Sequence, residues 1–264
     1  MVGMRDVAKA AGVSLSTVSL VVNNTGYVSA DMRAKVESAM RQLNYIPNEL
    51  ARHLYRNRTN TNGVIMPTIA HPFFSTLTAH LQREFAARDL KTLLCSTADT
   101  DKGESEYIDM LQRHMMDGII MAAHTEHPAD YWTSIHRPIV AFDRTLGEGV
   151  PVVRSDHEQG GRLIARQLID SGARHVVLVG GPRSQFAAAT TFPTIRYHLT
   201  VERLLAEAGI ACDYVEAGTV ADIAAHEATA CAIFEQYPDV DAIVGSDVVA
   251  SVALQEASRR GIEV

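Results

Sequence analysis

The stretch MRDVAKAAGVSLSTVSLVVNN, residues 4–24, decides how the N-terminal part of the chain folds. The apolar residues of its first half fall on one helical face. Gly12 predicts the end of that helix, because glycine readily adopts the left-handed conformation of a C-cap. Ser14 is a favourable N-cap for a second helix. The valines of this second helix recur at the i, i+3, i+4 spacing of a buried stripe: Val18, Val21 and Val22.

A third helix is predicted after the turn-forming residues Asn23-Asn-Thr-Gly26. Ser29 is its expected N-cap, and Asp31 lies in its first turn, where a negative charge interacts favourably with the helix dipole. Its inward stripe consists of Met32, Val36, Met40 and Leu43. Two short helices joined by a tight turn and closed by a third have helix-turn-helix organisation.

The second helix carries hydroxyl side chains outside its valine stripe: Ser16, Thr17 and Ser19. Hydroxyl residues that pack on nothing are poor helix formers. A helix that enters a DNA groove would explain them, because hydroxyls contact phosphates and base edges and small residues allow a close approach. A three-helix interaction module with the same packing is the alternative.

Charge is distributed unevenly along the chain. Residues 1–58 contain eight Lys and Arg and four Asp and Glu, a formal charge of +4. The remaining residues contain 16 basic and 27 acidic side chains, a charge of −11. A basic N-terminal segment on an acidic remainder indicates that the segment, and not the remainder, meets a polyanion.

The quoted stretch resembles the DNA-binding domain of the LacI/GalR family of bacterial transcription regulators. The similarity continues through Tyr27-Val-Ser29, Leu43-Asn-Tyr-Ile-Pro-Asn48, Leu50-Ala51 and Leu54, and extends more loosely over the rest of the chain. The resemblance implies that operator bases are selected by Leu15, Ser16 and Leu20. It also implies DNA contacts by Ser14, Thr17, Ser19, Asn23 and Ser29.

One departure from the family concerns Leu20, because many members carry arginine at that position. Arginine can grip guanine with two hydrogen bonds, worth about 1–3 kcal/mol of discrimination. Leucine could contact a thymine methyl group or leave specificity to other positions. The preferred operator therefore stays open at this point.

Residues 47–62 resemble the hinge helix and linker of the family. The segment Asn48–Tyr55 has too few residues for a stable isolated helix, so folding on DNA is physically reasonable. The resemblance implies that Leu54 enters the minor groove and kinks the duplex, with Asn48 and Ala51 beside it. An ordinary linker leucine is the alternative. The expected domains are a helix-turn-helix domain at 1–46, the hinge at 47–62 and two effector-binding subdomains at 63–154 and 155–264.

After the linker, strand-like apolar runs alternate with amphipathic stretches of helical length. Strands are expected at 63–66, 92–95, 118–121, 139–142, 175–180, 213–216 and 241–245. Helices are expected near 75–88, 104–115, 129–135, 158–171, 196–208, 222–236 and 248–260. This alternation indicates parallel sheets covered by helices. The predicted fold is an N-terminal all-α helix-turn-helix domain plus an α/β periplasmic-binding-protein-like body of two Rossmann-like subdomains, incomplete at its C-terminus.

Ligands of such sheets bind at the carboxyl ends of the strands. Phe73, Asp143 and Asp247 follow strands, and Arg196 opens a helix after a long loop. Carboxylates accept hydrogen bonds from hydroxyls, arginine donates two at once, and an aromatic face stacks on sugar C–H groups. The resemblance agrees with these positions and adds two weaker effector-binding candidates, His124 and Asp156. A sugar is the expected effector, and purines or nucleosides remain alternatives.

Other classes of protein are not favoured. No apolar run reaches the roughly 18 residues of a transmembrane helix, and the N-terminus has no secretory apolar region. The 3 cysteines are isolated, which predicts thiols in a reducing cytoplasm. Phosphate-loop, dinucleotide-binding and nucleophile-elbow motifs are missing. His124-Thr-Glu-His127 is a weak metal signal. We therefore expect no cofactor, no metal and no enzyme activity.

These observations predict a cytoplasmic, ligand-responsive transcriptional regulator that acts as a repressor. A homodimer would place two heads on a pseudo-palindromic operator in double-stranded DNA. The competing class is a soluble binding protein for a sugar or nucleoside, without regulatory DNA binding. By resemblance, the chain stops at Gly261–Val264 with about a fifth of the family's usual body still to come.

Overall fold

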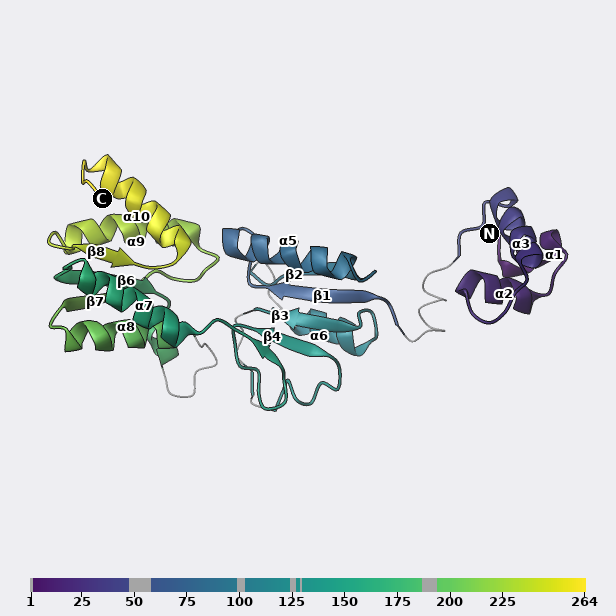
Figure 1. Cartoon of the computed structure of the whole chain (residues 1–264), viewed down its shortest axis with the longest axis horizontal. Helices are drawn as coiled ribbons and strands as arrows, with labels where there is room; N and C mark the ends of the chain where they lie inside the picture. Colours follow the sequence, from purple (N-terminus) through teal and green to yellow (C-terminus); the bar gives the residue numbers. More distant parts are fainter. Residues whose placement is uncertain (1, 48–57, 99–102, 124–126, 129, 187–193) are drawn as a thin grey trace. The chain divides into compact units, whose positions relative to one another are not determined.

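The computed structural model describes residues 2–47, 58–98, 103–123, 127–128, 130–186 and 194–264. The chain divides into two compact units, Met1–Thr59 and Asn60–Val264, which we call the head and the body. The head is helical and the body is α/β, so the predicted fold class is confirmed (Figure 1). Within the described ranges, no helix combines the length and the apolar character that crossing a membrane requires.

The head consists of three helices around a small valine-rich core: α1 (Met4–Ala11), α2 (Leu15–Asn23) and α3 (Ala30–Gln42). Val7, Val18 and Val36, one from each helix, are fully buried. The predicted caps are present. Gly12 ends α1 with a φ of 65°, and Ser14 Oγ accepts a hydrogen bond from the Thr17 amide at 3.1 Å. The predicted helix-turn-helix packing is therefore confirmed, except at Met32: it was predicted to face inward but is 40% exposed, and Ala39 packs in the core instead.

The first part of the body is a five-stranded parallel sheet in the order β2-β1-β3-β4-β5. Its strands are β1 (Thr61–Met66), β2 (Lys91–Ser96), β3 (Gly118–Met121), β4 (Ile139–Phe142) and β5 (Val152–Val153). Alternate residues of β1 face opposite sides. Val64 and Met66 pack with residues of α5 (Pro72–Ala86), whereas Ile65 packs with residues of α6 (Ser105–Gln112).

Two details of this sheet differ from the prediction. Strand β5 was not expected, and the helix expected near 129–135 is a series of turns over residues 130–134. The hydroxyls of Thr133 and Ser134 donate to the backbone carbonyls of Asp130 and Tyr131. Such local side-chain hydrogen bonds compete with helical pairing.

The second part of the body is a three-stranded parallel sheet in the order β7-β6-β8. Its strands are β6 (His175–Gly180), β7 (Ala211–Glu216) and β8 (Ala242–Val244), and a short 3₁₀ helix, η1 (Arg183–Phe186), follows β6. Val176 and Leu178 of β6 pack towards α7 (His157–Asp170) and α8 (Ile195–Glu207). Val177 and Val179 pack towards α9 (Ile223–Gln236) and α10 (Asp247–Arg259). Helices therefore cover both faces of this sheet (Figure 1).

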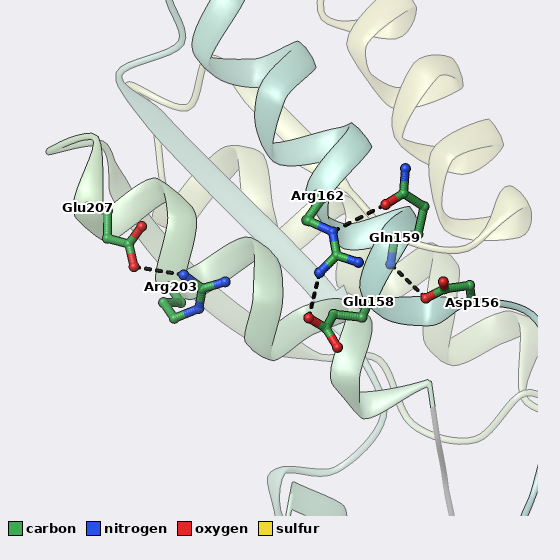
Figure 2. Close-up of polar contacts among 6 residues, drawn as sticks. All are labelled: Asp156, Glu158, Gln159, Arg162, Arg203 and Glu207. Atoms are coloured by element: carbon green, nitrogen blue, oxygen red, sulfur yellow. Dashed lines mark hydrogen bonds and ion pairs between the residues drawn. The ribbon is translucent and has the colours of Figure 1, made fainter.

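Helices α7 and α8 approach each other closely at Gly161. A Cβ atom there would lie 2.7 Å from the Tyr197 carbonyl oxygen and 2.8 Å from Thr200 Cβ, so only glycine fits without a shift. The exposed sides of both helices carry ion pairs four residues apart, Arg162 with Glu158 and Arg203 with Glu207 (Figure 2). Exposed pairs of this kind contribute only about 0.3–0.5 kcal/mol, so close packing holds these helices together.

Candidate DNA-binding and effector-binding sites

One side of α2 is exposed on the surface of the head. Leu15 and Ser16 are exposed, and they line a surface groove together with Ser19 and with residues at the start of α1. Ser14 lies at the N-terminus of the helix, where its Oγ is within 2.7 Å of Ser16 Oγ and 2.8 Å of Thr17 Oγ1. The result is a cluster of hydroxyls at the positively polarised end of a helix, a favourable environment for a phosphate.

The same groove contains Arg5, which the sequence prediction did not single out. Arg5 is exposed at the start of α1 and lines the groove opposite Leu15 and Ser16 of α2. A guanidinium beside hydroxyl groups is suited to binding a phosphate group. The basic charge of the N-terminal segment was the only sequence signal that pointed to this residue.

Other residues that were predicted to contact DNA make contacts within the head. Asn23 is only 5% exposed, and its Nδ2 donates to Ser19 Oγ at 3.2 Å, so the structure places it in the packing of α2. Leu20 is half-buried against the turn at Gly26. Ser29 is the N-cap of α3, where its Oγ accepts from the Met32 amide. The predicted hinge residues Asn48, Ala51 and Leu54 lie outside the described residues.

In the body, an aromatic group lies at the carboxyl ends of β1 and β4. Phe73, near the start of α5, is 46% exposed, and its ring centroid is 5.2 Å from Phe74 and 6.0 Å from Phe142. Phe142 is the last residue of β4 and directly precedes Asp143. The structure therefore brings the predicted effector residues Phe73 and Asp143 to the same edge of the sheet.

Asp143 is held firmly. Its φ of 52° is in the left-handed region, which costs a non-glycine residue about 1–3 kcal/mol and is common at functional sites. The amide of Asp143 donates to the Val153 carbonyl at 2.8 Å. Its Oδ1 lies 2.5 Å from Nε2 of His157, the first residue of α7. The carboxylate thus links the β4 end to the start of α7.

Asp247 is the first residue of α10, directly after the N-cap Ser246. Its side chain is 57% exposed, and its Oδ1 lies 3.6 Å from Nε2 of the buried His71. His71 is the N-cap of α5, and its Nδ1 accepts a hydrogen bond from the Phe73 amide at 3.3 Å. Val220, after β7, packs on a cluster that includes Phe74. The carboxyl ends of the two sheets of the body therefore meet at these residues.

The remaining predicted effector residues differ in their surroundings. Asp156 is the N-cap of α7, where its Oδ1 accepts from the Gln159 amide at 2.9 Å (Figure 2). Arg196 is exposed in the first turn of α8. His124 lies outside the described residues. Among the residues that the structure describes, no three His, Cys, Asp or Glu side chains are placed to hold a metal ion.

His71 and His157 are the polar residues that sequence reasoning missed. Each contacts a carboxylate that was predicted to bind effector. The only available signal was position, because each histidine precedes a predicted helix, near 75–88 for His71 and near 158–171 for His157. Such a signal cannot identify the partner, since the partner lies on a distant part of the chain.

Comparisons with known proteins agree with this architecture. Residues 3–48 match the family of bacterial regulatory proteins named lacI, and residues 59–264 match the periplasmic binding proteins and sugar binding domain of the LacI family. The ribose operon repressor of Bacillus subtilis is 34% identical over 266 residues, which cover 100% of this chain and 78% of that protein. The sucrose operon repressor of Streptococcus mutans is 39% identical over 178 residues, 67% of this chain.

The match with the sucrose operon repressors spans only about half of those proteins, 55% for Streptococcus mutans and 54% for Pediococcus pentosaceus. Among solved structures, the lac repressor dimer bound to operator and the anti-inducer ONPF is similar in fold. Its TM-score is 0.81 at 23% identity, covering 100% of this chain and 79% of that one. The matched domains cover both the head and the body, and the chain therefore belongs to the LacI family of bacterial regulatory proteins.

Proposed function

We propose that this chain is a sequence-specific DNA-binding transcriptional repressor that is controlled by a sugar bound between the two subdomains of its body. One combination carries the proposal: a head with a free hydroxyl-rich helix face and a body whose strand ends present aromatic and carboxylate side chains. The names of relatives, which are sucrose and ribose operon repressors, support both halves of it. A regulator of this kind binds its ligands and does not turn them over.

In the proposed DNA complex, α2 lies in the major groove. Leu15 and Ser16 then face base edges, and Ser14, Thr17 and Arg5 face phosphates. Two protomers place two heads on a pseudo-palindromic operator in double-stranded DNA. In the hinge, which includes Asn48 and Ala51, Leu54 enters the minor groove between base steps. The lac repressor dimer bound to operator is a structural neighbour that supports binding of operator DNA by a dimer.

The proposed effector site lies where the carboxyl ends of the two sheets meet. The exposed face of Phe73 stacks on the C–H groups of a sugar ring, and Asp143 and Asp247 accept hydrogen bonds from its hydroxyls. Arg196 donates from α8, and His124 and Asp156 complete the proposed set. The cellobiose complex of the transcriptional regulator CelR, which is similar in fold with a TM-score of 0.60, supports a sugar as the class of ligand.

The two sites are coupled if sugar binding changes the angle between the subdomains. Because the hinge connects the head to the first strand of the body, such a change alters how two hinge helices meet on DNA. This is allostery through one two-state element, with both ligands biasing the same equilibrium. The direction of the response follows from which angle the sugar favours.

The test combines DNA selection with a sugar panel. The full chain is used to select duplexes from a random library, and the selected sequence is compared with random DNA across a salt series. We expect tight selective binding that weakens as salt rises. Binding of D-ribose or sucrose without selective DNA binding would instead indicate a soluble sugar-binding protein. A turnover assay with the same sugars detects any enzyme activity.

A substitution at Leu54 tests the proposed role of the hinge separately. Substituting Leu54→Ala should weaken binding to the selected duplex more than binding to random DNA, because wedge insertion occurs only at the deformed central step. Fluorescence anisotropy on both duplexes measures this ratio. An equal loss on the two duplexes would contradict the minor-groove wedge.

A further inference from the structure

Two histidine–carboxylate pairs connect the two subdomains of the body in opposite directions. His71, before α5 in the first subdomain, faces Asp247 of α10 in the second. His157, the first residue of α7 in the second subdomain, faces Asp143 at the end of β4 in the first. Each subdomain therefore contributes one histidine and one carboxylate. Both carboxylates are residues of the proposed effector site.

The Asp143–His157 pair is the tighter of the two. Nε2 and Oδ1 are 2.5 Å apart, and both side chains are largely shielded from solvent, at 14% and 23% exposure for His157 and Asp143. The backbone at Asp143 is left-handed and is fixed by the hydrogen bond from its amide to Val153. The contact with His157 fixes the direction of the Asp143 carboxylate. It therefore determines which lone pairs of the carboxylate are available to a ligand.

The His71–Asp247 pair is looser. His71 Nδ1 accepts the Phe73 amide hydrogen bond, and its Nε2 faces Asp247 Oδ1 at 3.6 Å. His71 is buried and close to the buried His226 of α9. Burial and the proximity of His71 lower the pKa of His226, whereas Asp222 opposes this shift. From α10, the charged group that faces Nε2 of His71 is Asp247.

We propose that His71 and His157 are positioning residues that clasp the two subdomains by holding the effector-site carboxylates of the opposite subdomain. A sugar hydroxyl that binds Asp143 or Asp247 has to share that carboxylate with the clasp. The clasp therefore sets the ligand-free angle between the subdomains and orients the oxygen atoms that the sugar meets. The part of this inference that concerns sugar rests on the proposed function, whereas the clasp itself does not.

The first test needs no ligand. Urea unfolding of the full chain is measured for Asp143→Asn, His157→Leu and the double variant, because asparagine tolerates the left-handed backbone at position 143. We expect the double variant to lose no more stability than the worse single variant. Losses that add would overturn the Asp143–His157 contact. The pair His175 and Asp213, 2.8 Å apart within one subdomain, is the matched control for a histidine–carboxylate contact.

Small-angle X-ray scattering then tests whether these contacts clasp the subdomains. The variant His71→Leu/His157→Leu should show a broader distribution of interatomic distances than the wild-type chain, whereas His175→Leu should match the wild type. Identical scattering from wild type and the double variant would overturn the clasp. Hydrogen exchange at the core strand 175–180 checks that each variant remains folded.

The sugar affinity of His157 variants separates a positioning role of this residue from a purely structural one. For whichever of D-ribose and sucrose binds the wild-type chain, His157→Gln should retain most of the affinity, because glutamine keeps an N–H donor at similar reach. His157→Leu should lose at least tenfold, and His175→Leu should bind as wild type. Equal affinity of the leucine and glutamine variants would overturn the positioning role. If neither sugar binds the wild type, the effector proposal fails, and the unfolding and scattering results still decide the clasp.

Discussion

On helix α2 of the head, the helical period separates packing from exposure: Val18 is fully buried, whereas Ser16, two residues earlier and on the opposite side of the helix, is exposed. At the strand ends of the body this separation is lost. Asp143 and Asp247 each face a histidine, and Asp156 caps α7. The head thus leaves Leu15 and Ser16 exposed, although it uses Ser14 and Ser29 as helix caps, while the carboxylates of the body site all make structural contacts. This difference predicts that substitutions at Leu15 or Ser16 affect binding alone and those at the body site affect binding and stability together.

The largest effect is expected from placing a charge on either face of α2. Val18→Asp buries an unpaired carboxylate in the core of the head and should cost more than about 4 kcal/mol, which unfolds the head. Leu15→Asp adds the same charge to the exposed face. It should change stability by no more than about 0.5 kcal/mol, because Leu15 is exposed in the first turn of α2, while weakening DNA binding by repulsion of phosphates. Hydrogen exchange resolved by peptide reports on head and body separately.

If both aspartate variants unfold the head, or if neither does, the distinction between buried and exposed positions on α2 is wrong. In either variant the peptides of the body should exchange as in the wild type, because the head and the body are separate compact units. Loss of protection in the body would show that the two units fold as one.

A second comparison concerns two neighbouring glycines of α7. Alanine at either position gains about 0.5–1 kcal/mol of helix propensity. A Cβ at Gly161 meets the Tyr197 carbonyl oxygen at 2.7 Å, whereas one at Gly160 meets the Tyr197 ring at 3.5 Å. Gly161→Ala should therefore be about 2 kcal/mol less stable than Gly160→Ala by urea unfolding. Equal stability of the two variants would mean that α7 and α8 are not in tight contact there.

The third prediction concerns His198 of α8, which packs against Tyr197 and Tyr214. Burial, reinforced by the charge of Arg183 and opposed by Glu202, lowers its pKa from 6.5 to about 4. Between these pH values the unfolded chain binds a proton that the native chain does not, so stability falls as the pH is lowered. His198→Gln should remove a contribution of about 3 kcal/mol to the loss between pH 7 and pH 4.

Unfolding free energies of the wild type and His198→Gln at several pH values check this contribution. Other titrating groups are common to both chains and cancel in the difference. The same pH dependence in both chains would show that His198 titrates normally.

The smallest effect is expected at Asp156. Asp156→Ala removes the cap on the Gln159 amide and should cost about 1 kcal/mol. Asp156→Ser keeps a capping oxygen and should restore most of that stability. Isothermal titration of the serine variant with sugar then shows whether the carboxylate also binds effector. The proposed effector role predicts a loss of affinity in the serine variant, and an unchanged affinity would leave Asp156 with the capping role alone.

The head could be predicted almost completely from sequence because its information is local. The valine spacing and the caps at Ser14 and Ser29 depend on residues within one or two helical turns, and the structure contains each of them. The burial of Asn23 could not be predicted in the same way, since a polar residue beside a turn gives no sign of the core on which it packs.

In the body, the alternation of strands and helices predicted the two parallel sheets, and the strand-end rule placed Phe73 and Asp143 at one edge. Their partners were out of reach of sequence reasoning. His157 lies 14 residues from Asp143, and His71 meets Asp247 only because the carboxyl ends of two sheets come together. The two-residue strand β5 is too short to give a periodic signal.

The central claim is that one chain binds DNA through the head and a sugar through the body, with the two events coupled. The most direct measurement is fluorescence anisotropy of the full chain on its selected duplex, with and without D-ribose or sucrose, beside random DNA at matched salt. The account predicts selective binding whose affinity changes by at least about fivefold when the sugar is added. Binding that does not distinguish the selected duplex from random DNA, or that is unchanged by a sugar shown to bind the body, would contradict it.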